Sequence, residues 1–185
     1  MILPVVAYGA VILRTPCLPV TPDTPGLQQL ITNMWHTLDN ANGVGLAAPQ
    51  VNHSYQLFIV DSLKTTTPDD LSGIRQVFIN ATVLEYSIEQ CTDTEGCLSI
   101  PGIWEEVSRA EWITLQYQDA SFVTHTRTFT GSTARMIQHE YDHVQGKLYL
   151  DYLSPLRKAL LKNKLQAISK GKTTARYPMV IQRSR

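Results

Sequence analysis

The hexapeptide at residues 138–143 reads Gln-His-Glu-Tyr-Asp-His, and it constrains this chain more than any other stretch. On a helix, His139 and His143 share a face with Cβ atoms about 5 to 6 Å apart, close enough to hold one metal ion. Glu140 projects about 100° further round the helix, where a general base for a water molecule would sit. The alternative is a helix with two partly buried, hydrogen-bonded histidines. We interpret the hexapeptide as a metal site on a helix.

A third ligand is needed, because a catalytic site of this kind has three protein ligands and one open position. No His or Glu follows His143, and Asp151 is the only carboxylate further along the chain. Tyr149 stands where the longer metalloprotease pattern places its third ligand. The missing ligand is therefore expected upstream of the hexapeptide.

Cys97 is the best upstream candidate, since a soft thiolate can complete a site of two imidazoles and one sulfur. It lies in the sequence Glu-Gly-Cys-Leu-Ser at residues 95–99, which indicates a tight extended turn. The backbone N–H of Leu98 is expected to point into the site. The usual fate of a free cysteine is that of a small buried hydrophobe, which better describes Cys17 and Cys91.

Small residues dominate the run Gly-Val-Gly-Leu-Ala-Ala-Pro-Gln at residues 43–50. Such residues let a backbone lie close against a ligand strand or against the metal helix. A phosphate loop is disfavoured, because the third glycine and the Lys-Ser/Thr pair are absent. Gln50 ends the run, either as a turn residue or as an amide donor to a developing oxyanion. Met136, on the face of His139, either lines a pocket or belongs to the core.

The chain has 185 residues and a formal net charge of zero, which suits one globular domain over residues 1–185. Prolines and Arg14 interrupt the first 20 residues, so we expect no signal peptide and no membrane partner. Three cysteines without framework spacing indicate a reducing compartment, with the cytoplasm as the default.

The C-terminal part of the chain is basic. Asp151 is the last acidic residue, and we expect residues 170–185 to form a flexible basic tail. The segment is either a solvated helix face with a frayed end or a patch that attracts nucleic-acid phosphates, and no DNA partner is expected. The basic residues after Asp151 are Arg157, Lys158, Lys162, Lys164, Lys170, Lys172, Arg176, Arg183 and Arg185.

Hydrophobic periodicity predicts three helices and at least four strands. A first helix follows Thr24-Pro25, read as an N-cap and a first-turn proline. The metal helix runs from Gly131 to about Val144, and a last helix from about 155 to 169 carries an apolar stripe made of Leu156, Leu160, Leu161, Leu165 and Ile168. The predicted strands cover residues 56–61, 77–86, 112–118 and 123–130, with a surface loop at 64–73.

The chain resembles the peptide deformylase family over nearly its whole length. The motifs at residues 43–50, 95–99 and 138–143 all match the family patterns, in the family's order. Three motifs in order are highly specific, although each alone is weak to moderate. The resemblance implies an α+β fold, in which antiparallel strands pack around a central metal-binding helix, with an N-terminal and a C-terminal helix.

The resemblance also implies a role for each matched residue. The metal ligands would be Cys97, His139 and His143, with Glu140 as general acid and base. Gln50 and the Leu98 N–H would bind the oxyanion. Arg109 would pair with Asp142 in support of the ligands. The positions that match the surroundings of the substrate are Val44, Gly45, Glu95 and Met136.

The implied reaction is removal of the N-formyl group from N-formylmethionyl nascent peptides. The implied cofactor is one divalent metal ion per chain, ferrous iron in the cell, which nickel, cobalt or zinc can replace. The basic C-terminal helix resembles an element that contacts the ribosome. Ser132 and Thr133 stand where the family usually has apolar residues, which affects the shape of the pocket.

Two other functions are compatible with parts of the pattern. One is a zinc endopeptidase, which is disfavoured because the downstream ligand is missing. The other is a binding module with a structural metal, which would act through its basic tail.

Overall fold

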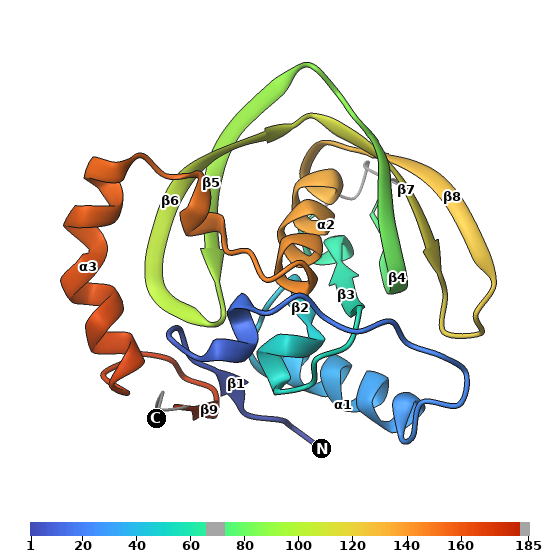
Figure 1. Ribbon diagram of the computed structural model, residues 1–185, viewed down its shortest axis with the longest axis horizontal. Helices are drawn as coiled ribbons and strands as arrows, with labels where there is room; N and C mark the ends of the chain where they lie inside the picture. The colour runs from blue at the N-terminus through green and yellow to red at the C-terminus, as the bar shows by residue number, and fades with distance from the viewer. Residues whose placement is uncertain (66–72, 182–185) are drawn as a thin grey trace.

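The metal-binding hexapeptide lies on the central helix of the molecule. In the computed structural model, which describes residues 1–65 and 73–181, helix α2 (Gly131–Val144) runs through the middle with strands on both sides (Figure 1). The side-chain amide of Gln138 anchors the helix, because it donates to the carbonyl oxygens of Ala110 at 2.9 Å and Ala134 at 3.2 Å. The bounds predicted for this helix are confirmed.

An antiparallel sheet of five strands, in the order β2-β3-β4-β7-β8, packs against α2. It confirms the four predicted strands and adds a short one in the run of small residues. The strands are β2 (Gly45–Ala47), β3 (Leu57–Asp61), β4 (Arg75–Tyr86), β7 (Trp112–Gln118) and β8 (Thr124–Thr130).

The two faces of this sheet are covered by different helices. Alternate residues of β3 point to opposite faces, as the period of a strand requires. Phe58 packs in the cluster that contains Ile137 of α2. Ile59 packs in the cluster that contains Met34 of α1 (Leu27–Asn40). The apolar run at residues 57–60 of β3 therefore reflects burial on both faces.

A long hairpin on the other side of α2 was not predicted. Strands β5 (Gln90–Cys97) and β6 (Ile100–Ala110) pair antiparallel, with an irregularity between Gly96 and Cys97. Most of β5 is polar and exposed, so it lacks the apolar alternation by which strands are recognised. The predicted turn around Cys97 is the end of this hairpin.

Helix α1 begins later than predicted. Gly26, in the left-handed region at φ 71°, occupies the N-cap position, and the first helical residue is Leu27. Thr24 instead closes a turn, because its hydroxyl oxygen accepts from the N–H of Thr21 at 3.0 Å. The predicted N-cap at Thr24 and first-turn Pro25 are therefore wrong by two residues.

Helix α3 (Pro155–Ser169) lies on the outside of the β5–β6 hairpin (Figure 1). Its predicted apolar stripe is correct for Leu161, Leu165 and Ile168, which are buried. It is wrong for Leu156 and Leu160, whose exposed fractions are 72% and 64%. These two leucines project on the solvent side because only one narrow face of the helix meets the hairpin.

The segment after α3 folds back onto the N-terminal part of the chain. Strand β9 (Met179–Val180) pairs in parallel with β1 (Val5–Val6). Backbone hydrogen bonds join residues 178 and 180 of the expected tail to the strand β1 region, and the flexibility of residues 170–185 stays a prediction. Residues 182–185 lie outside the described part of the chain.

Two other expectations concern the surface. The predicted loop at 64–73 falls mostly on residues 66–72, which are outside the described residues. Among the helices in residues 1–65 and 73–181, none has the length and apolar character that crossing a membrane requires.

Candidate active site and metal centre

Three donor side chains meet between α2 and the end of β5. The ligand atoms of Cys97, His139 and His143 lie within 4.8 Å of one another. The Sγ of Cys97 is 3.3 Å from the Nε2 of His143, and the two imidazole rings have centroids 5.1 Å apart. The fold therefore brings together the predicted upstream cysteine and the two histidines of the hexapeptide.

This donor set fits a divalent metal ion. One sulfur and two imidazole nitrogens suit zinc, ferrous iron, nickel or cobalt, and three ligands leave a position open for water or substrate. Donor atoms bound to one ion at about 2.0 to 2.3 Å lie about 3 to 4 Å from one another. The 3.3 Å between Cys97 Sγ and His143 Nε2 falls in this range.

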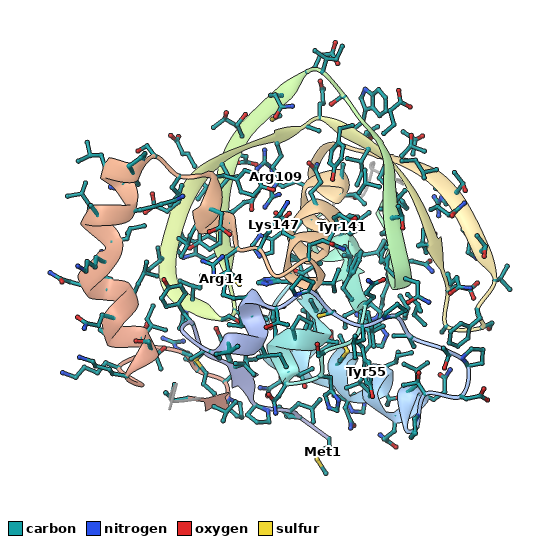
Figure 2. The ribbon with its side chains drawn as sticks, viewed as in Figure 1. Met1, Arg14, Tyr55, Arg109, Tyr141 and Lys147 are labelled. Atoms are coloured by element: carbon teal, nitrogen blue, oxygen red, sulfur yellow. The ribbon has the colours of Figure 1, made fainter. Side chains whose placement is uncertain are left out.

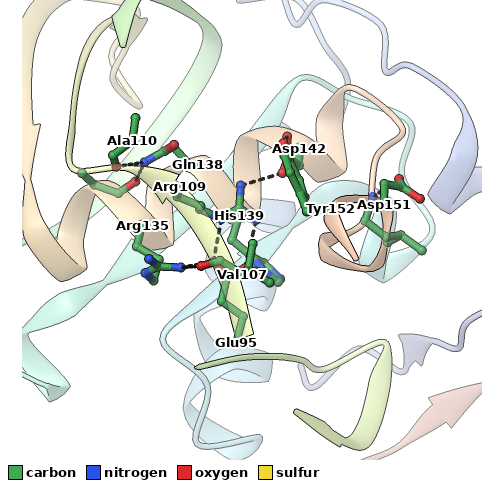
Figure 3. A network of polar contacts seen from close by, with 12 residues as sticks. Glu95, Val107, Arg109, Ala110, Arg135, Gln138, His139, Asp142, Asp151 and Tyr152 are labelled. Carbon is green, nitrogen blue, oxygen red and sulfur yellow. Dashed lines mark hydrogen bonds and ion pairs between the residues drawn. The ribbon is translucent and has the colours of Figure 1, made fainter. Parts of the chain in front are cut away.

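The carboxylate of Glu95 orients His139. Glu95 Oε2 lies 2.9 Å from His139 Nδ1, and both side chains are largely enclosed (Figure 3). Burial opposes ionisation of Glu95, but hydrogen bonds from His139 and Arg109 lower its pKa to about 2. An ionised carboxylate only accepts hydrogen bonds, so Nδ1 carries the proton. The Nε2 lone pair of His139 is then available to a metal.

Arg109 joins this carboxylate to the hexapeptide. It lies between the β5–β6 hairpin and α2 (Figure 2), and it donates to Glu95 through Nε at 2.6 Å and Nη2 at 2.9 Å. Its Nη1 donates to Asp142 Oδ2 at 2.8 Å, so the predicted pair of Arg109 and Asp142 is present. Arg135 adds a contact of 2.7 Å to Glu95 Oε1, and Tyr152 donates to Asp142 Oδ1 at 3.0 Å.

Gln50 is fixed with its amide nitrogen toward the site. The N–H of Ala47 donates to Gln50 Oε1 at 2.8 Å, which leaves Nε2 on the side of Cys97. Nε2 lies 3.4 Å from Cys97 Sγ and 3.3 Å from Ser99 Oγ. Because the Gln50 side chain is only 1% exposed, its amide is a preorganised donor beside the metal ligands.

Glu140 lies against β2 and is set apart from the ion pairs. A Cβ added to Gly45 would come within 2.4 Å of Glu140 Oε1, so glycine is required for this close approach. Burial is the main cause that raises the pKa of Glu140, to about 7. Its Oε2 is buried and has no hydrogen-bond partner among the described residues. A carboxyl group with these properties can take up and release a proton near neutral pH.

The two histidines are in different electrostatic surroundings. Burial opposes protonation of His139, but Cys97 and Glu95 hold its pKa well above the ordinary value. Burial and the neighbouring positive charge of His139 hold the pKa of His143 well below it. The pocket thus favours one positive charge beside Cys97 and Glu95, which is the kind of environment that attracts a cation.

A cavity of about 700 Å³ opens onto these groups. Most of the residues that the sequence predicted for the site line this cavity. His143, Arg109 and Asp142 are predicted site residues that do not line it. The predicted residues in its wall are Val44, Gly45, Gln50, Glu95, Cys97, Leu98, Met136, His139 and Glu140. Residues 174–177, which the sequence did not link to the site, form another part of the wall.

The sequence patterns missed several contributors. Both oxygens of Glu95 are engaged by Arg109, Arg135 and His139, so its contact with substrate is limited to its place in the wall. Arg135 lies one helical turn before His139, and that spacing was an available signal. Tyr152 and Tyr177 could not be found from local spacing. Tyr152 lies beyond the end of the metal helix, ten residues after Asp142, and Tyr177 is 79 residues from Leu98.

Curated proteins resemble this chain over nearly its whole length. Two curated relatives named peptide deformylase, from Christiangramia forsetii and Flavobacterium johnsoniae, are 44% and 43% identical over 187 residues. Each alignment covers 97% of this chain and 95% of the relative.

Solved structures show the same fold. Arabidopsis thaliana peptide deformylase 1B, in complex with an inhibitor, matches with a TM-score of 0.82 and 29% identity over 91% of each chain. A class I type b peptide deformylase from Acinetobacter baumannii, with Met-Ala-Ser bound, matches with a TM-score of 0.75 and 35% identity over 83% of this chain and 99% of that one. The family model described as polypeptide deformylase matches residues 2–159. This chain belongs to the polypeptide deformylase family, the metal-dependent hydrolases that remove the N-formyl group from nascent peptides.

Proposed function

We propose that Cys97, His139 and His143 hold one ferrous ion, beside which Glu140 carries out the proton transfers of deformylation. The observation that carries this proposal is Glu140 itself. Its carboxyl is buried, its pKa is raised by burial to about 7, and its Oε2 lacks a partner among the described residues. These properties suit a group that must first accept a proton and then give it back at the pH of the cell.

The reaction is the hydrolysis of a formamide. A divalent ion in this site supplies a Lewis acid that makes water more acidic and polarises the formyl oxygen. Glu140 accepts a proton from the attacking water as the new C–O bond forms at the formyl carbon. Gln50 Nε2 and the Leu98 N–H donate to the oxygen that becomes negative; losing one such donor typically costs about a hundredfold or more in rate. The C–N bond then breaks, Glu140 protonates the leaving amine, and formate is released.

The substrate chain would lie in the cavity beside β2. Val44, Gly45 and Met136 are in its wall, and we propose that they contact the N-formylmethionyl residue. The Acinetobacter relative bound to Met-Ala-Ser supports a peptide with methionine at its start as the ligand of such a site. Glu95 contributes to the wall and holds His139 in place.

The proton-transfer role is tested with Glu140→Gln, which keeps the volume of the side chain and removes its basicity. Formate release from a formyl-Met peptide should fall by about a thousandfold or more, while metal content stays at one ion per chain. A variant that keeps its metal and more than a tenth of the wild-type rate would rule out Glu140 as the acid and base. Cys97→Ala should lose both the metal and the activity. The wild type should not cleave casein, which would exclude the alternative of a zinc endopeptidase.

The identity of the metal is a separate part of the proposal. A thiolate bound to ferrous iron is exposed to oxidation. Protein purified without oxygen should contain iron, and air should inactivate it faster than the nickel-substituted protein. Equal half-lives of the two forms in air would argue against iron as the native ion or against Cys97 as its ligand.

We also propose that the enzyme works in the cytoplasm and contacts the ribosome through α3. The three cysteines are free, in agreement with a reducing compartment. Lys158, Lys162 and Lys164 are exposed on α3, where they can approach RNA phosphates. Replacing these lysines with glutamate should abolish co-sedimentation with ribosomes at low salt and leave formate release from free peptides unchanged. Unchanged co-sedimentation would place the contact elsewhere.

A further inference from the structure

The segment that follows α3 reaches the active-site cavity. Residues 174–177 line it, and β9 directly after them is held by β1. The N–H of Val5 donates to the carbonyl of Pro178 at 2.8 Å, and that of Ala7 donates to Val180 at 3.0 Å. This segment lies beyond residues 2–159, the part matched by the family model.

Tyr177 makes the direct contact with the catalytic turn. Its hydroxyl donates to the carbonyl oxygen of Leu98 at 2.8 Å, across 79 positions of sequence. The side chain is half-buried in the cavity wall. Leu98 directly follows Cys97, so this hydrogen bond acts on the residue whose N–H is the proposed oxyanion donor.

The turn at residues 97–99 is held at each of its residues. Gln50 Nε2 lies against Cys97 Sγ and Ser99 Oγ, and the N–H of Tyr8 donates to the Ser99 carbonyl at 2.8 Å. The Leu98 side chain packs with the α1 cluster. The Leu98 carbonyl is a further backbone acceptor of the turn, and Tyr177 supplies its donor. The Leu98 N–H and the Leu98 carbonyl belong to the two peptide planes on either side of the Leu98 Cα, and only rotation about the two backbone bonds of that Cα changes one relative to the other. Holding the carbonyl, the Leu98 side chain and the neighbouring residues therefore restricts the direction of the Leu98 N–H.

We propose that Tyr177 is a positioning residue for deformylation, which fixes the Leu98 carbonyl and thereby aims the Leu98 N–H at the oxygen that becomes negative. The inference rests on the proposed role of Leu98. It predicts that loss of the Tyr177 hydroxyl affects turnover more than substrate binding, because the aimed N–H matters most when the oxygen carries charge.

The test compares Tyr177→Phe with Tyr55→Phe, a matched removal of a hydroxyl from a half-buried tyrosine in the α1 cluster. Both proteins are loaded with the same metal and assayed with a formyl-Met peptide. Tyr177→Phe should lower kcat about three- to tenfold, the effect of one lost neutral hydrogen bond, with KM within about twofold and full metal content. Tyr55→Phe should match the wild type. Equal kcat in the two variants, or a fall in kcat that follows metal loss, would overturn the proposal.

A second readout does not depend on activity. In zinc-loaded protein labelled with ¹⁵N-leucine, the amide signal of Leu98 should shift in Tyr177→Phe and remain in place in Tyr55→Phe. An unmoved Leu98 signal would overturn positioning by Tyr177 whatever the reaction. Absence of formate release by the wild type would instead overturn the proposed function, so the two failures are distinguishable.

Discussion

Glu95 and His139 lie 2.9 Å apart, Oε2 to Nδ1, and this contact joins the β5–β6 hairpin to the metal helix. Cys97 is two residues from Glu95 on the same strand. Strand β5 therefore supplies both a proposed metal ligand and the carboxylate that orients another ligand. Its placement sets the geometry of the centre as much as α2 does.

Removal of the Glu95 charge should weaken metal binding. Glu95→Gln leaves His139 without its carboxylate acceptor, and loss of such a partner typically costs about 10- to 100-fold in metal affinity. Glu105→Gln is a matched control, because Glu105 is equally buried on β6, directly opposite Glu95, but its carboxylate pairs with Arg157 at 2.5 Å rather than with His139. Competition with a chelator measures both variants. Equal affinities would show that Glu95 does not support the metal.

The same carboxylate should make stability depend on acid pH. The pKa of Glu95 is lowered from 4.5 to about 2, since contacts with His139 and Arg109 outweigh the effect of burial. A lowered pKa gives stability that is fully present above pH 4.5 and is lost as the pH falls through about 2. The shift corresponds to about 3 kcal/mol. Urea unfolding should therefore show a free-energy gap between wild type and Glu95→Gln that narrows from pH 6 to pH 3. A constant gap would contradict this.

The small residue at position 45 should be essential for turnover. In Gly45→Ala, the added Cβ would lie 2.4 Å from Glu140 Oε1 and 2.8 Å from its Cγ, so the carboxyl must move. A displacement of about 1 Å can lower a rate by about a hundredfold. We expect kcat for formate release to fall about ten- to hundredfold with the metal retained. Wild-type turnover would mean that Glu140 can shift without consequence.

The cysteines outside the centre should differ in reactivity. Burial raises the pKa of Cys17 to about 11, against a hydrogen bond with Ser54, and the side chain is 5% exposed. Cys91 is exposed. Because the thiolate is the reactive form, a disulfide reagent at pH 8 should label Cys91 about a hundredfold faster than Cys17 or more. Mass spectrometry of the labelled peptides measures both rates, and similar rates would contradict the burial of Cys17.

Adjacent leucines of α3 should respond oppositely to truncation. Leu161 is 5% exposed and Leu160 is 64% exposed. Leu161→Ala should lower the free energy of unfolding by about 2 to 4 kcal/mol, and Leu160→Ala should change it by less than about 0.5 kcal/mol. Thermal or urea unfolding of the two variants checks this. Equal losses would mean that α3 is rotated from the described position.

The parts of the fold that sequence predicts are those with local periodicity. Helix α2 and the β7–β8 hairpin follow from spacing and alternation within a few residues. Strand β5 does not, because its outward side chains are polar and its stability comes from pairing with β6. The exposure of Leu160 could not be predicted from the sequence either. Amphipathic spacing shows which residues share a helix face, but it does not show how much of that face the neighbouring hairpin covers.

The residues of the site also fall into those that a local sequence pattern predicts and those that it does not. His139, Glu140 and His143 were predicted from helical spacing, and Cys97 was predicted from the chemistry of the missing donor; the three possible ligands lie together in the fold. The resemblance to a family supplied the pairing of Arg109 with Asp142, which is present at 2.8 Å. The binding of Glu95 to two arginines and to His139 depends on how the hairpin closes over α2. Such contacts between distant segments leave no local pattern in the sequence.

The parallel pairing of β1 with β9 has a consequence for the order in which the enzyme is completed. β1 is translated long before β9. The strand β1 therefore lacks its partner β9 until nearly all of the described chain has been synthesised. The part of the cavity wall formed by residues 174–177, which includes Tyr177, is in place only after that point. The hexapeptide and Cys97 can come together earlier, so during its own biosynthesis a metal-binding core should form before the mature substrate cavity does.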